Sequence, residues 1–396
     1  MSFKVDFNQI YRFGDVCRVI NGRAYKKTEF HDVGKYAVLR VGNFFSSDRW
    51  YYSDLELEED KYCENGDLLF AWSASFGPKI WDGEKVIYHY HIWKLEPSEL
   101  VNKFFLYYWL LYSREKMLSS MHGSVMGHLT KSSFENQQIS LPQLLEQKNI
   151  AAILSSLDDK IELNRKINDN LEDQMQTIFG SVFYPELEAG NKVSLGDYLY
   201  IKGRIGWKGL KKDEYLDDSG FRIINGESLT VKGIDWNKAG YISEERYAES
   251  PEIMLQEGDI LISKDGTIGK IGYVNILDKP TAVASGIFVV RNLKPDEVST
   301  VFIYCLFKSV YFNHFIASRT EGSVIPHLYQ KDFVTLEIPL LSEEQLRFFN
   351  ESVTSLFELY FSNNTENIRL ASLRDTLLPK LMSGELDVSE INLIVR

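Results

Sequence analysis

Two stretches of this chain decide its fold: residues 150–182, IAAILSSLDDKIELNRKINDNLEDQMQTIFGSV, and residues 349–381, FNESVTSLFELYFSNNTENIRLASLRDTLLPKL. They lie 199 residues apart, and in each a seam of mostly apolar residues advances by steps of 4 and 3. The first seam is Ile150, Leu154, Leu157, Ile161, Asn164, Asn168, Leu171, Met175, Ile178 and Val182; the second is Phe349, Val353, Leu356, Tyr360, Asn363, Asn367, Leu370, Arg374, Leu377 and Leu381. This spacing keeps one helix face turned toward a partner helix. Because the two seams match, the sequence predicts duplicated helices that pair with each other.

Each seam is interrupted by two asparagines at corresponding places, Asn164 and Asn168 in the first and Asn363 and Asn367 in the second. A polar residue at a seam position fixes helix register at a cost in stability. We therefore expect these four side chains to set the stagger of the pair. At the position of Met175, the second seam carries Arg374, for which the sequence alone offers no reason.

The duplication extends to the segments before the helices. Gly14-Asp15-Val16 is answered by Gly196-Asp197-Tyr198, and at the same offset of 182 Leu39-Arg40-Val41 resembles Phe221-Arg222-Ile223. Asn65–Phe70 resembles Glu257–Ile262 at 192, and the Gly-Ser-Val segments at 123 and 322 correspond at 199. The growing offset indicates loop insertions in the second copy.

Within each copy, short β-branched or aromatic runs alternate with Gly, Asn and Asp, which is typical of strands. Strands are expected at 86–95, 260–263, 270–275 and 286–291, helices at 102–119 and 298–318, and a helix exit with linker at 180–191. The predicted fold class is α+β, with each α/β unit followed by a long helix.

Composition narrows the function further. The chain has 396 residues and a net charge of −12, but residues 1–143 carry 17 basic against 18 acidic groups, and residues 191–340 carry 18 against 20. Most of the negative charge therefore belongs to the helical segments, and a locally basic DNA-binding face is not excluded. There is no apolar run long enough to span a membrane and no signal peptide, and the three scattered cysteines fit a reducing, cytoplasmic compartment.

Signatures of catalysis are absent. Gly266–Lys270 is too short for a phosphate-binding loop, and GxSxG, HExxH and GxGxxG do not occur. The triplet Asp158-Asp159-Lys160 resembles a nuclease set, but a solvated helix face explains it better. His89 and His91 share a strand face and can bind a metal, although a structural role is the simpler interpretation. The sequence thus predicts neither a metal site nor an enzyme acting alone.

Loops that contain several basic residues and some aromatic residues occur at corresponding places in both copies. Their residues are Arg18, Arg23, Tyr25, Lys26 and Lys27 in the first copy and Lys202, Arg204, Trp207, Lys208, Lys211 and Lys212 in the second. Lys26 and Lys208 correspond at the offset of 182. Such loops suit contacts to phosphates and guanine edges, whereas an ordinary solvated loop is the alternative.

Two further pairs of segments are candidates for DNA contact. They contribute Trp72, Ser73 and Lys264 after a repeated Gly-Asp strand, and Ser124, His128, Lys131, Ser323, His327 and Lys331 around the Gly-Ser-Val…His-Leu segments. A tight turn or local capping is the alternative for each.

The helix EQKNIAAILSSLDDKIELNRKINDNLE, the C-terminal LRDTLLPKLMSGELDV and the pair GSVMGHL/GSVIPHL resemble conserved regions of the specificity subunits of type I restriction–modification systems. The resemblance covers essentially the whole chain. It implies target recognition domains at 1–143 and 191–341, a spacer helix with linker at 144–190, and a second spacer helix with the C-terminal segment at 342–396. The two helices would pack as an antiparallel coiled coil with pseudo-twofold symmetry.

The resemblance also implies a function. Each domain would read one half of a bipartite, asymmetric DNA site, and the subunit would be non-catalytic and bind no cofactor itself. Its partners would be double-stranded DNA, two methyltransferase subunits that bind S-adenosylmethionine, and restriction subunits that use ATP and Mg²⁺. The acidic helix faces and the segment LLPKLMSG are candidates for docking those partners.

Antiparallel pairing would place Asn164 near Asn367 and Asn168 near Asn363. The first seam would span about 50 Å at 1.5 Å per residue, or on the order of 15 base pairs, which suits a split site with an unread gap. Two other classes of function remain open: a protein-interaction scaffold that uses the coiled coil alone, and a stand-alone DNA-modifying enzyme.

Overall fold

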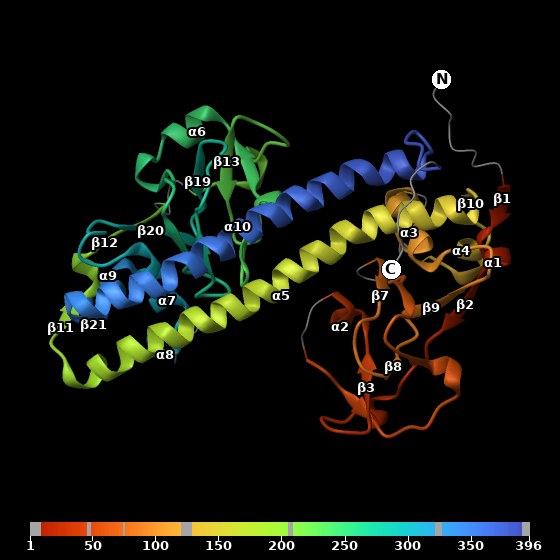
Figure 1. Cartoon of the computed structure of the whole chain (residues 1–396), viewed down its shortest axis with the longest axis horizontal. Helices are drawn as coiled ribbons and strands as arrows, with labels where there is room; N and C mark the ends of the chain where they lie inside the picture. The colour runs from red at the N-terminus through yellow and green to blue at the C-terminus, as the bar shows by residue number, and fades with distance from the viewer. Residues whose placement is uncertain are drawn as a thin grey trace. The chain divides into compact units, whose positions relative to one another are not determined.

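Both halves of the chain contain a four-stranded sheet of equivalent strand order, followed in the chain by a long helix. Figure 1 shows the two long helices, α5 and α10. The computed structural model describes residues 9–45, 49–73, 76–119, 129–204, 209–320 and 327–389. By its internal contacts the chain divides into unit 1, Met1–Leu163 with Glu366–Arg396, and unit 2, Asn164–Thr365. This division splits both long helices between the units, whereas the domain boundaries expected from the sequence set the helices apart.

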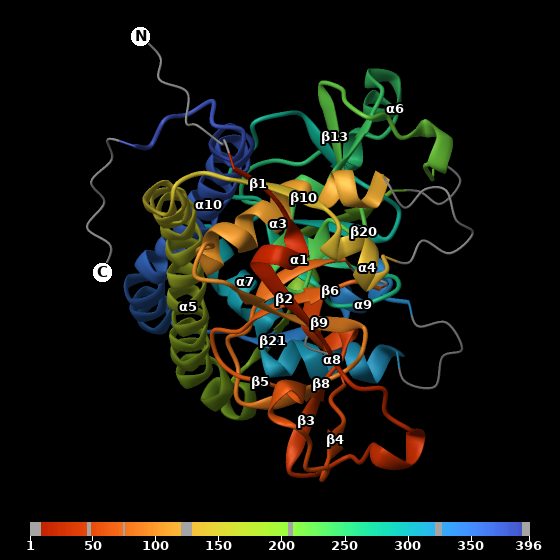
Figure 2. The same ribbon diagram turned by 90° about the vertical axis from the view of Figure 1, so that its right-hand side faces the viewer.

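In unit 1, an antiparallel sheet has the order β2-β9-β6-β7 and a second sheet the order β4-β3-β8-β5. Figure 2 shows β2, β9 and β6 side by side. The strands are β1 (Gln9–Arg12), β2 (Cys17–Asn21), β3 (Tyr36–Leu39), β4 (Tyr52–Ser53), β5 (Tyr62–Cys63), β6 (Leu68–Ala71), β7 (Gly77–Ile80), β8 (Val86–Tyr88), β9 (Ile92–Pro97) and β10 (Gln138–Leu141). The short helices are α1 (Phe13–Val16), α2 (Val41–Phe45) and α4 (Lys131–Glu135), and α3 (Lys103–Ser119) is longer.

Unit 2 repeats this plan with β12-β20-β17-β18 and β16-β13-β19, and adds the hairpin β14–β15. Its strands are β11 (Lys192–Ser194), β12 (Leu199–Gly203), β13 (Phe221–Ile224), β14 (Leu229–Thr230), β15 (Gly233–Ile234), β16 (Gly240–Ile242), β17 (Ile260–Ser263), β18 (Ile271–Tyr273), β19 (Thr281–Val283), β20 (Ile287–Asn292) and β21 (Glu337–Pro339). Its helices are α6 (Glu244–Ala248), α7 (Thr300–Lys308), α8 (Val310–Thr320) and α9 (Gln330–Val334).

The strand registers confirm the duplication and correct one part of the alignment. The parallel pairs Val38–Ile87 and Ile223–Ala282 occupy the same place in the two units, so β3 and β13 correspond at an offset of 185. The isolated bridges His31–Tyr52 and Leu216–Tyr241 agree with that offset. The predicted match of Leu39 with Phe221 is therefore wrong. The loop before β13 contains three additional residues, and the sequence pattern did not locate them.

The two long helices are α5 (Leu144–Ala189) and α10 (Glu343–Met382), which lie side by side within each unit (Figure 1). In unit 2 they run antiparallel, since Asn168 contacts Asn363 while Glu186 contacts Gln345. On α5, eight of the ten predicted seam residues are buried: Ile150, Leu154, Ile161, Asn164, Asn168, Leu171, Met175 and Val182. On α10, five of the ten are buried, namely Phe349, Val353, Tyr360, Asn363 and Leu381, and the other five are half-buried. The predicted pairing of the helices is confirmed.

Three predicted elements differ from the structure. The strand expected at 86–95 is interrupted by a turn between β8 and β9, so His89 and His91 do not share a strand face. α5 continues through the expected linker at 180–191, past Pro185, because Phe183 is fully buried and Leu187 packs against the same core. The single helix expected at 298–318 is broken at Ser309, whose hydroxyl accepts the backbone NH of Phe312 at 3.2 Å and so begins α8. Among the described residues no single helix is long and apolar enough to cross a membrane; α7 and α8 qualify only together, across a bend of 61°.

Candidate nucleic-acid interface

One carboxylate holds the basic loop of unit 1 in place. Glu29 accepts hydrogen bonds from both terminal nitrogens of Arg23, at 3.0 and 2.7 Å, and from the backbone NH of Lys26 at 2.7 Å. These donors lower the pKa of Glu29 to about 2. Arg23 lies 5.0 Å from the centre of the Tyr25 ring, whereas Lys26 and Lys27 are exposed. Lys26 and Lys27 are therefore the cations of this loop most accessible to a phosphate.

Unit 2 builds the same turn with different support. The backbone NH of Lys211 donates to Glu214 at 2.6 Å, as that of Lys26 does to Glu29, and Lys211 and Lys212 are exposed. The cation beside Glu214 is Arg246 of α6, with 2.9 Å between Nε and Oε1. Lys26 thus corresponds to Lys211 and not to Lys208, and Arg246 takes the place of Arg23 from a distant part of the chain. Nothing in the local sequence pattern pointed to Arg246.

The remaining basic positions of unit 2 differ in accessibility. Lys202 on β12 is partly exposed, 5.9 Å from the Tyr200 ring centre. Arg204 is only 2% exposed, its Nε donates to the Val283 carbonyl at 3.4 Å, and burial lowers its pKa. In this conformation the Arg204 side chain is therefore not accessible to a phosphate. Five predicted contacts lie outside the described residues: Ser124, His128, Trp207, Lys208 and Ser323.

An aromatic cluster forms where Trp72 meets the turn between β8 and β9. The Trp72 Nε1 donates to the carbonyl of Tyr90 at 2.9 Å, and its ring centre lies 5.2 Å from that of His91 and 6.2 Å from that of Tyr90. The rings of Tyr90 and His91 are 3.9 Å apart, and His89 lies 4.4 Å from Tyr90. Tyr90 is 38% exposed, and Ser73 beside the cluster is partly exposed. Sequence reasoning missed Tyr90, although its place between two histidines was a usable signal.

The basic loop of unit 1 is attached to this cluster through the backbone. The NH of Arg23 donates to the Tyr88 carbonyl at 3.1 Å, and the NH of Tyr90 donates to the Arg23 carbonyl at 3.0 Å. Gly22 makes the approach possible, because a Cβ there would lie 2.4 Å from the carbonyl oxygen of His89. The structure therefore brings Arg23 and Tyr25, which the sequence placed in one loop, together with Trp72 from another.

The same place in unit 2 has another chemistry. The NH of Lys264 donates to the Gly286 carbonyl at 2.9 Å, just as the NH of Trp72 donates to the His91 carbonyl at 3.1 Å. Leu328 NH donates to the Lys264 carbonyl at 3.1 Å, and His327 Nδ1 contacts Asp265 Oδ1. Lys264 and His327, both predicted contacts, thus lie together.

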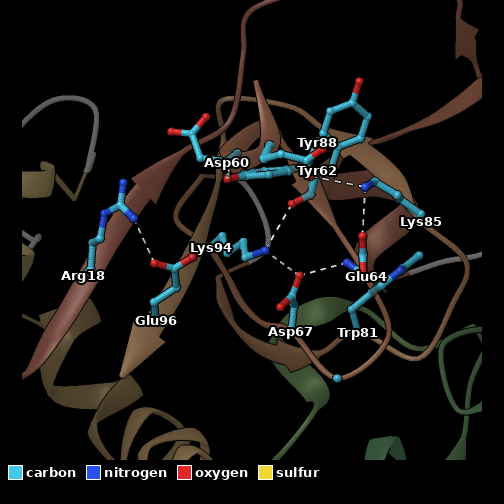
Figure 3. Close-up of polar contacts among 12 residues, drawn as sticks. Arg18, Asp60, Tyr62, Glu64, Asp67, Trp81, Lys85, Tyr88, Lys94 and Glu96 are labelled. Atoms are coloured by element: carbon cyan, nitrogen blue, oxygen red, sulfur yellow. Dashed lines mark hydrogen bonds and ion pairs between the residues drawn. The ribbon is translucent and has the colours of Figure 1, made fainter. Parts of the chain in front are cut away.

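Arg18 and Lys131 lie apart from the aromatic cluster. Arg18 is opposite Glu96 on the β2–β9 ladder, and their side chains are 3.1 Å apart (Figure 3). Asn21, at the other end of that ladder, is opposite Trp93. Both basic residues line a polar cavity of about 740 Å³, where Lys131 is 3.6 Å from Glu135. In unit 2, Lys331 on α9 is exposed. These three cations remain predicted phosphate contacts.

A partly buried ion pair stabilises each sheet, but its cation comes from a different position. In unit 1, Lys94 Nζ lies 2.8 Å from Asp67 and donates to the Tyr62 carbonyl at 3.3 Å (Figure 3). In unit 2, Asp259 corresponds to Asp67, and Arg291 donates to it at 2.7 and 2.8 Å. The repeated Gly-Asp pair was visible in the sequence, but the role of its carboxylate as the partner of a partly buried cation was not.

The other candidate sites also have structural roles. In the described part of the chain, no group of three His, Cys, Asp or Glu is placed to hold a metal. Burial, with His91 and Arg40 nearby, lowers the pKa of His89 to about 4. Asp158 is not simply part of a solvated face, because it accepts from Arg374 and from Tyr108, both at 2.7 Å. That ion pair explains the arginine in the second seam.

The seam asparagines of unit 2 form a connected set. Asn363 Nδ2 donates to Asn168 Oδ1 at 2.8 Å, and Asn168 Nδ2 donates to the Tyr360 carbonyl at 3.0 Å and to Asn364 Oδ1 at 2.9 Å. The expected contact of Asn168 with Asn363 is confirmed. Asn164 is fully buried in unit 2, whereas Asn367 belongs to unit 1, and their expected contact stays a prediction.

Comparison with known proteins agrees with this duplicated architecture. The model of the type I restriction modification DNA specificity domain matches the chain twice, at residues 5–173 and 191–347. The chain is 24% identical over 344 residues to the specificity subunit of type I restriction enzyme MjaVIII from Methanocaldococcus jannaschii, covering 82% of this chain and 80% of that protein. It is also 24% identical over 475 residues to the HindI specificity subunit from Haemophilus influenzae, covering 95% and 99%.

The fold has a counterpart among solved structures. The type I restriction–modification S subunit from M. genitalium matches with a TM-score of 0.60 and 19% identity, over 96% of this chain and 98% of that one. With two matches of the family model that together cover most of its length, the chain belongs to the type I restriction–modification specificity subunits.

Proposed function

We propose that this chain is the DNA-reading subunit of a type I restriction–modification complex, in which units 1 and 2 each read one half of a bipartite, asymmetric site. The observation that carries the proposal is the pair of units with one topology and different surface chemistry. Two identical halves would favour a palindrome, whereas halves that differ favour an asymmetric target.

In this proposal the chain is non-catalytic. It acts in the cytoplasm and directs two methyltransferase subunits and the restriction subunits to the DNA. S-adenosylmethionine, ATP and Mg²⁺ are bound by those partners. Exposed apolar side chains on the long helices supply a docking surface: Leu163 and Leu373 in unit 1, and Phe348 and Leu359 in unit 2. Of the segment LLPKLMSG, Leu381 and Met382 are buried in the core of unit 1, which leaves its polar side chains for partners.

The seam asparagines have a role in the same proposal. Asn168 and Asn363 fix helix stagger, because sliding either helix would leave buried amide groups without their acceptors. Replacing Asn164, Asn168, Asn363 and Asn367 together by Leu should stabilise the helix pair but permit slippage. The measurement is the gap of the methylated motif: an unchanged, single gap length would argue against the register role.

The direct test is a methylome. The chain is expressed with its cognate methyltransferase subunit in a methylation-free host, and modified adenines are mapped by single-molecule sequencing. A split motif that disappears without this chain supports the proposal. Methylation that is unchanged by omitting the chain, with both proteins expressed, contradicts it and favours a protein-interaction scaffold or an enzyme of another kind.

The lysine turns provide a second test. Lys26→Glu/Lys27→Glu and Lys211→Glu/Lys212→Glu should each weaken binding to all DNA sequences and reduce the slope of log K against log salt by about 2, close to one for each phosphate that is no longer neutralised. The matched control is Lys238→Glu, at an exposed lysine of the 3-10 turn Trp236–Lys238. A pair of reversals that leaves the salt slope unchanged would exclude that turn as a phosphate-binding element.

A further inference from the structure

The two units present different side chains on the same backbone arrangement. We call this arrangement the frame: it consists of the residue that follows β6 or β17 and the turn that precedes β9 or β20. In each unit, the residue that follows the strand β6 or β17 donates its NH to the turn that precedes β9 or β20, at 3.1 Å in unit 1 and 2.9 Å in unit 2. Trp72 therefore corresponds to Lys264, and the turn His89-Tyr90-His91 corresponds to Ala284-Ser285-Gly286. At these matched positions the two units carry side chains of different chemistry.

In unit 1 the frame carries an aromatic surface. Four rings, those of Trp72, His89, Tyr90 and His91, gather around the turn, and Tyr90 is its exposed member at 38%. His89 stays uncharged at neutral pH, since its pKa is lowered to about 4. The nearby cation Arg23 is paired with Glu29. This surface offers apolar contact and stacking in place of positive charge.

In unit 2 the frame carries charge and little bulk. Lys264 is partly buried, with its Nζ 5.0 Å from the Phe288 ring centre, and burial lowers its pKa. Asp265 contacts His327 and keeps 46% of its side chain exposed. The turn residues Ala284, Ser285 and Gly286 are small and partly exposed, and Asp265 is exposed beside them. A lysine donor and a carboxylate acceptor here suit the hydrogen-bonding edges of bases.

We propose that these two frames are the base-reading surfaces of the units: Tyr90 with Trp72 reads apolar features of its half-site, chiefly a thymine methyl, and Lys264 with Asp265 reads the polar edges of a G·C pair. The inference rests on the proposed function and adds which residues read bases and which class of base edge each unit takes. Guanine offers N7 and O6 as acceptors to a lysine, cytosine N4 donates to a carboxylate, and thymine alone offers a methyl group in the major groove.

The test uses the whole chain with its methyltransferase partner and reads base preference at every position of the methylated motif. Tyr90→Ala should lower discrimination about tenfold or more at an A·T position of one half-site and leave the other half-site unchanged. Lys264→Met should do the same at a G·C position of the other half-site. The matched controls are Tyr112→Ala on α3, where the side chain is 42% exposed, and Lys238→Met; both should preserve the whole motif.

The outcomes separate the two proposals. If the wild-type chain yields no split motif, the proposed function falls and this inference falls with it. If the wild-type motif is split but Tyr90→Ala and Lys264→Met change neither half, or change the same half, only the inference is overturned. If Tyr90→Ala does not fold, Tyr90→Leu takes its place, because leucine keeps an apolar side chain at the surface. Tyr90→Leu should lower base discrimination in the same half-site, by less than Tyr90→Ala would.

Discussion

At the scale of single residues, Gly22 determines whether the basic loop can meet the aromatic turn. A Cβ at this position would lie 2.4 Å from the carbonyl oxygen of His89 and 2.6 Å from that of Tyr88, and both are backbone atoms. Such atoms cannot move aside as the end of a flexible side chain can. The absence of one methyl group thus permits the two backbone hydrogen bonds between Arg23 and the turn.

Gly22→Ala should therefore destabilise unit 1 by about 1–3 kcal/mol, the usual cost of forcing extra volume into a packed site. Chemical denaturation followed by circular dichroism measures the change. Gly42→Ala on α2 is the control, since a Cβ there meets nothing within 4 Å, and it should be neutral or slightly stabilising. Equal effects of both substitutions would show that the close approach is unimportant.

His89 makes stability depend on pH. Its folded pKa is about 4, below the ordinary value of 6.5, so the unfolded chain binds the extra proton first as pH falls. The contribution of uncharged His89 to the free energy of unfolding is fully present above pH 6.5 and is lost as the pH falls from 6.5 toward 4. With solvent screening taken into account, the loss is roughly 2 kcal/mol. His89→Gln should flatten unfolding curves over this window, whereas His31→Gln, at an exposed histidine, should not. A slope unaltered by His89→Gln would contradict the assignment.

At the scale of elements, Arg374 joins α10 to α5 in unit 1. Its NH1 lies 2.7 Å from Asp158, whose second oxygen accepts the hydroxyl of Tyr108 from α3. About a quarter of each charged side chain is exposed. The half-buried carboxylate of Asp158 thus connects α5 with α10 and α3. An apolar residue at position 374 would not donate to it.

Arg374→Met should cost about 1–3 kcal/mol, because Asp158 would lose its counter-charge in a partly desolvated site. A double-mutant cycle with Asp158→Asn measures the coupling, expected at about 1–3 kcal/mol. The exposed pair Lys160–Glu366, at 3.2 Å, is the matched control and should show a coupling below about 1 kcal/mol. Couplings of the same size in both pairs would show that burial does not strengthen the first.

At the scale of the whole molecule, each unit has its own hydrophobic core. Phe134 and Phe333 occupy corresponding places 199 residues apart, and both side chains are fully buried. Phe134 packs on Phe13 and Phe70, with ring centres at 4.5 and 5.0 Å, and Phe333 packs on Phe288 at 5.8 Å. The core of each unit includes one part of α5 and one part of α10.

Phe134→Ala and Phe333→Ala should each cost about 3–5 kcal/mol, as large-to-small core substitutions do. Hydrogen exchange followed by mass spectrometry should show faster exchange mainly in the strands of the substituted unit. Comparable acceleration in both units after either substitution would mean that the cores unfold as one.

The sequence by itself determined the duplicated plan, the two long helices, their polar seam positions and the family. The plan, the helices and the seam positions follow from the repeats and the 4-3 spacing, whereas the family follows from the resemblance of the helical and C-terminal motifs. Asn168 and Asn363 were expected to be close because the family resemblance implies antiparallel helices related by a pseudo-twofold, and their contact is confirmed. The ends were less predictable: α5 extends past Pro185 because Phe183 is buried in a core that spacing does not reveal.

Only the tertiary structure decided which loops meet. Arg23 and Arg246 hold equivalent glutamates from unrelated positions, Arg204 turns inward, and Trp72 joins Tyr90 in one surface. The physical reason is that strand register and loop insertion bring distant segments together, and burial then selects which side chains stay exposed. A basic or aromatic residue type specifies what a loop can bind, but the packed fold determines whether that side chain can reach a ligand.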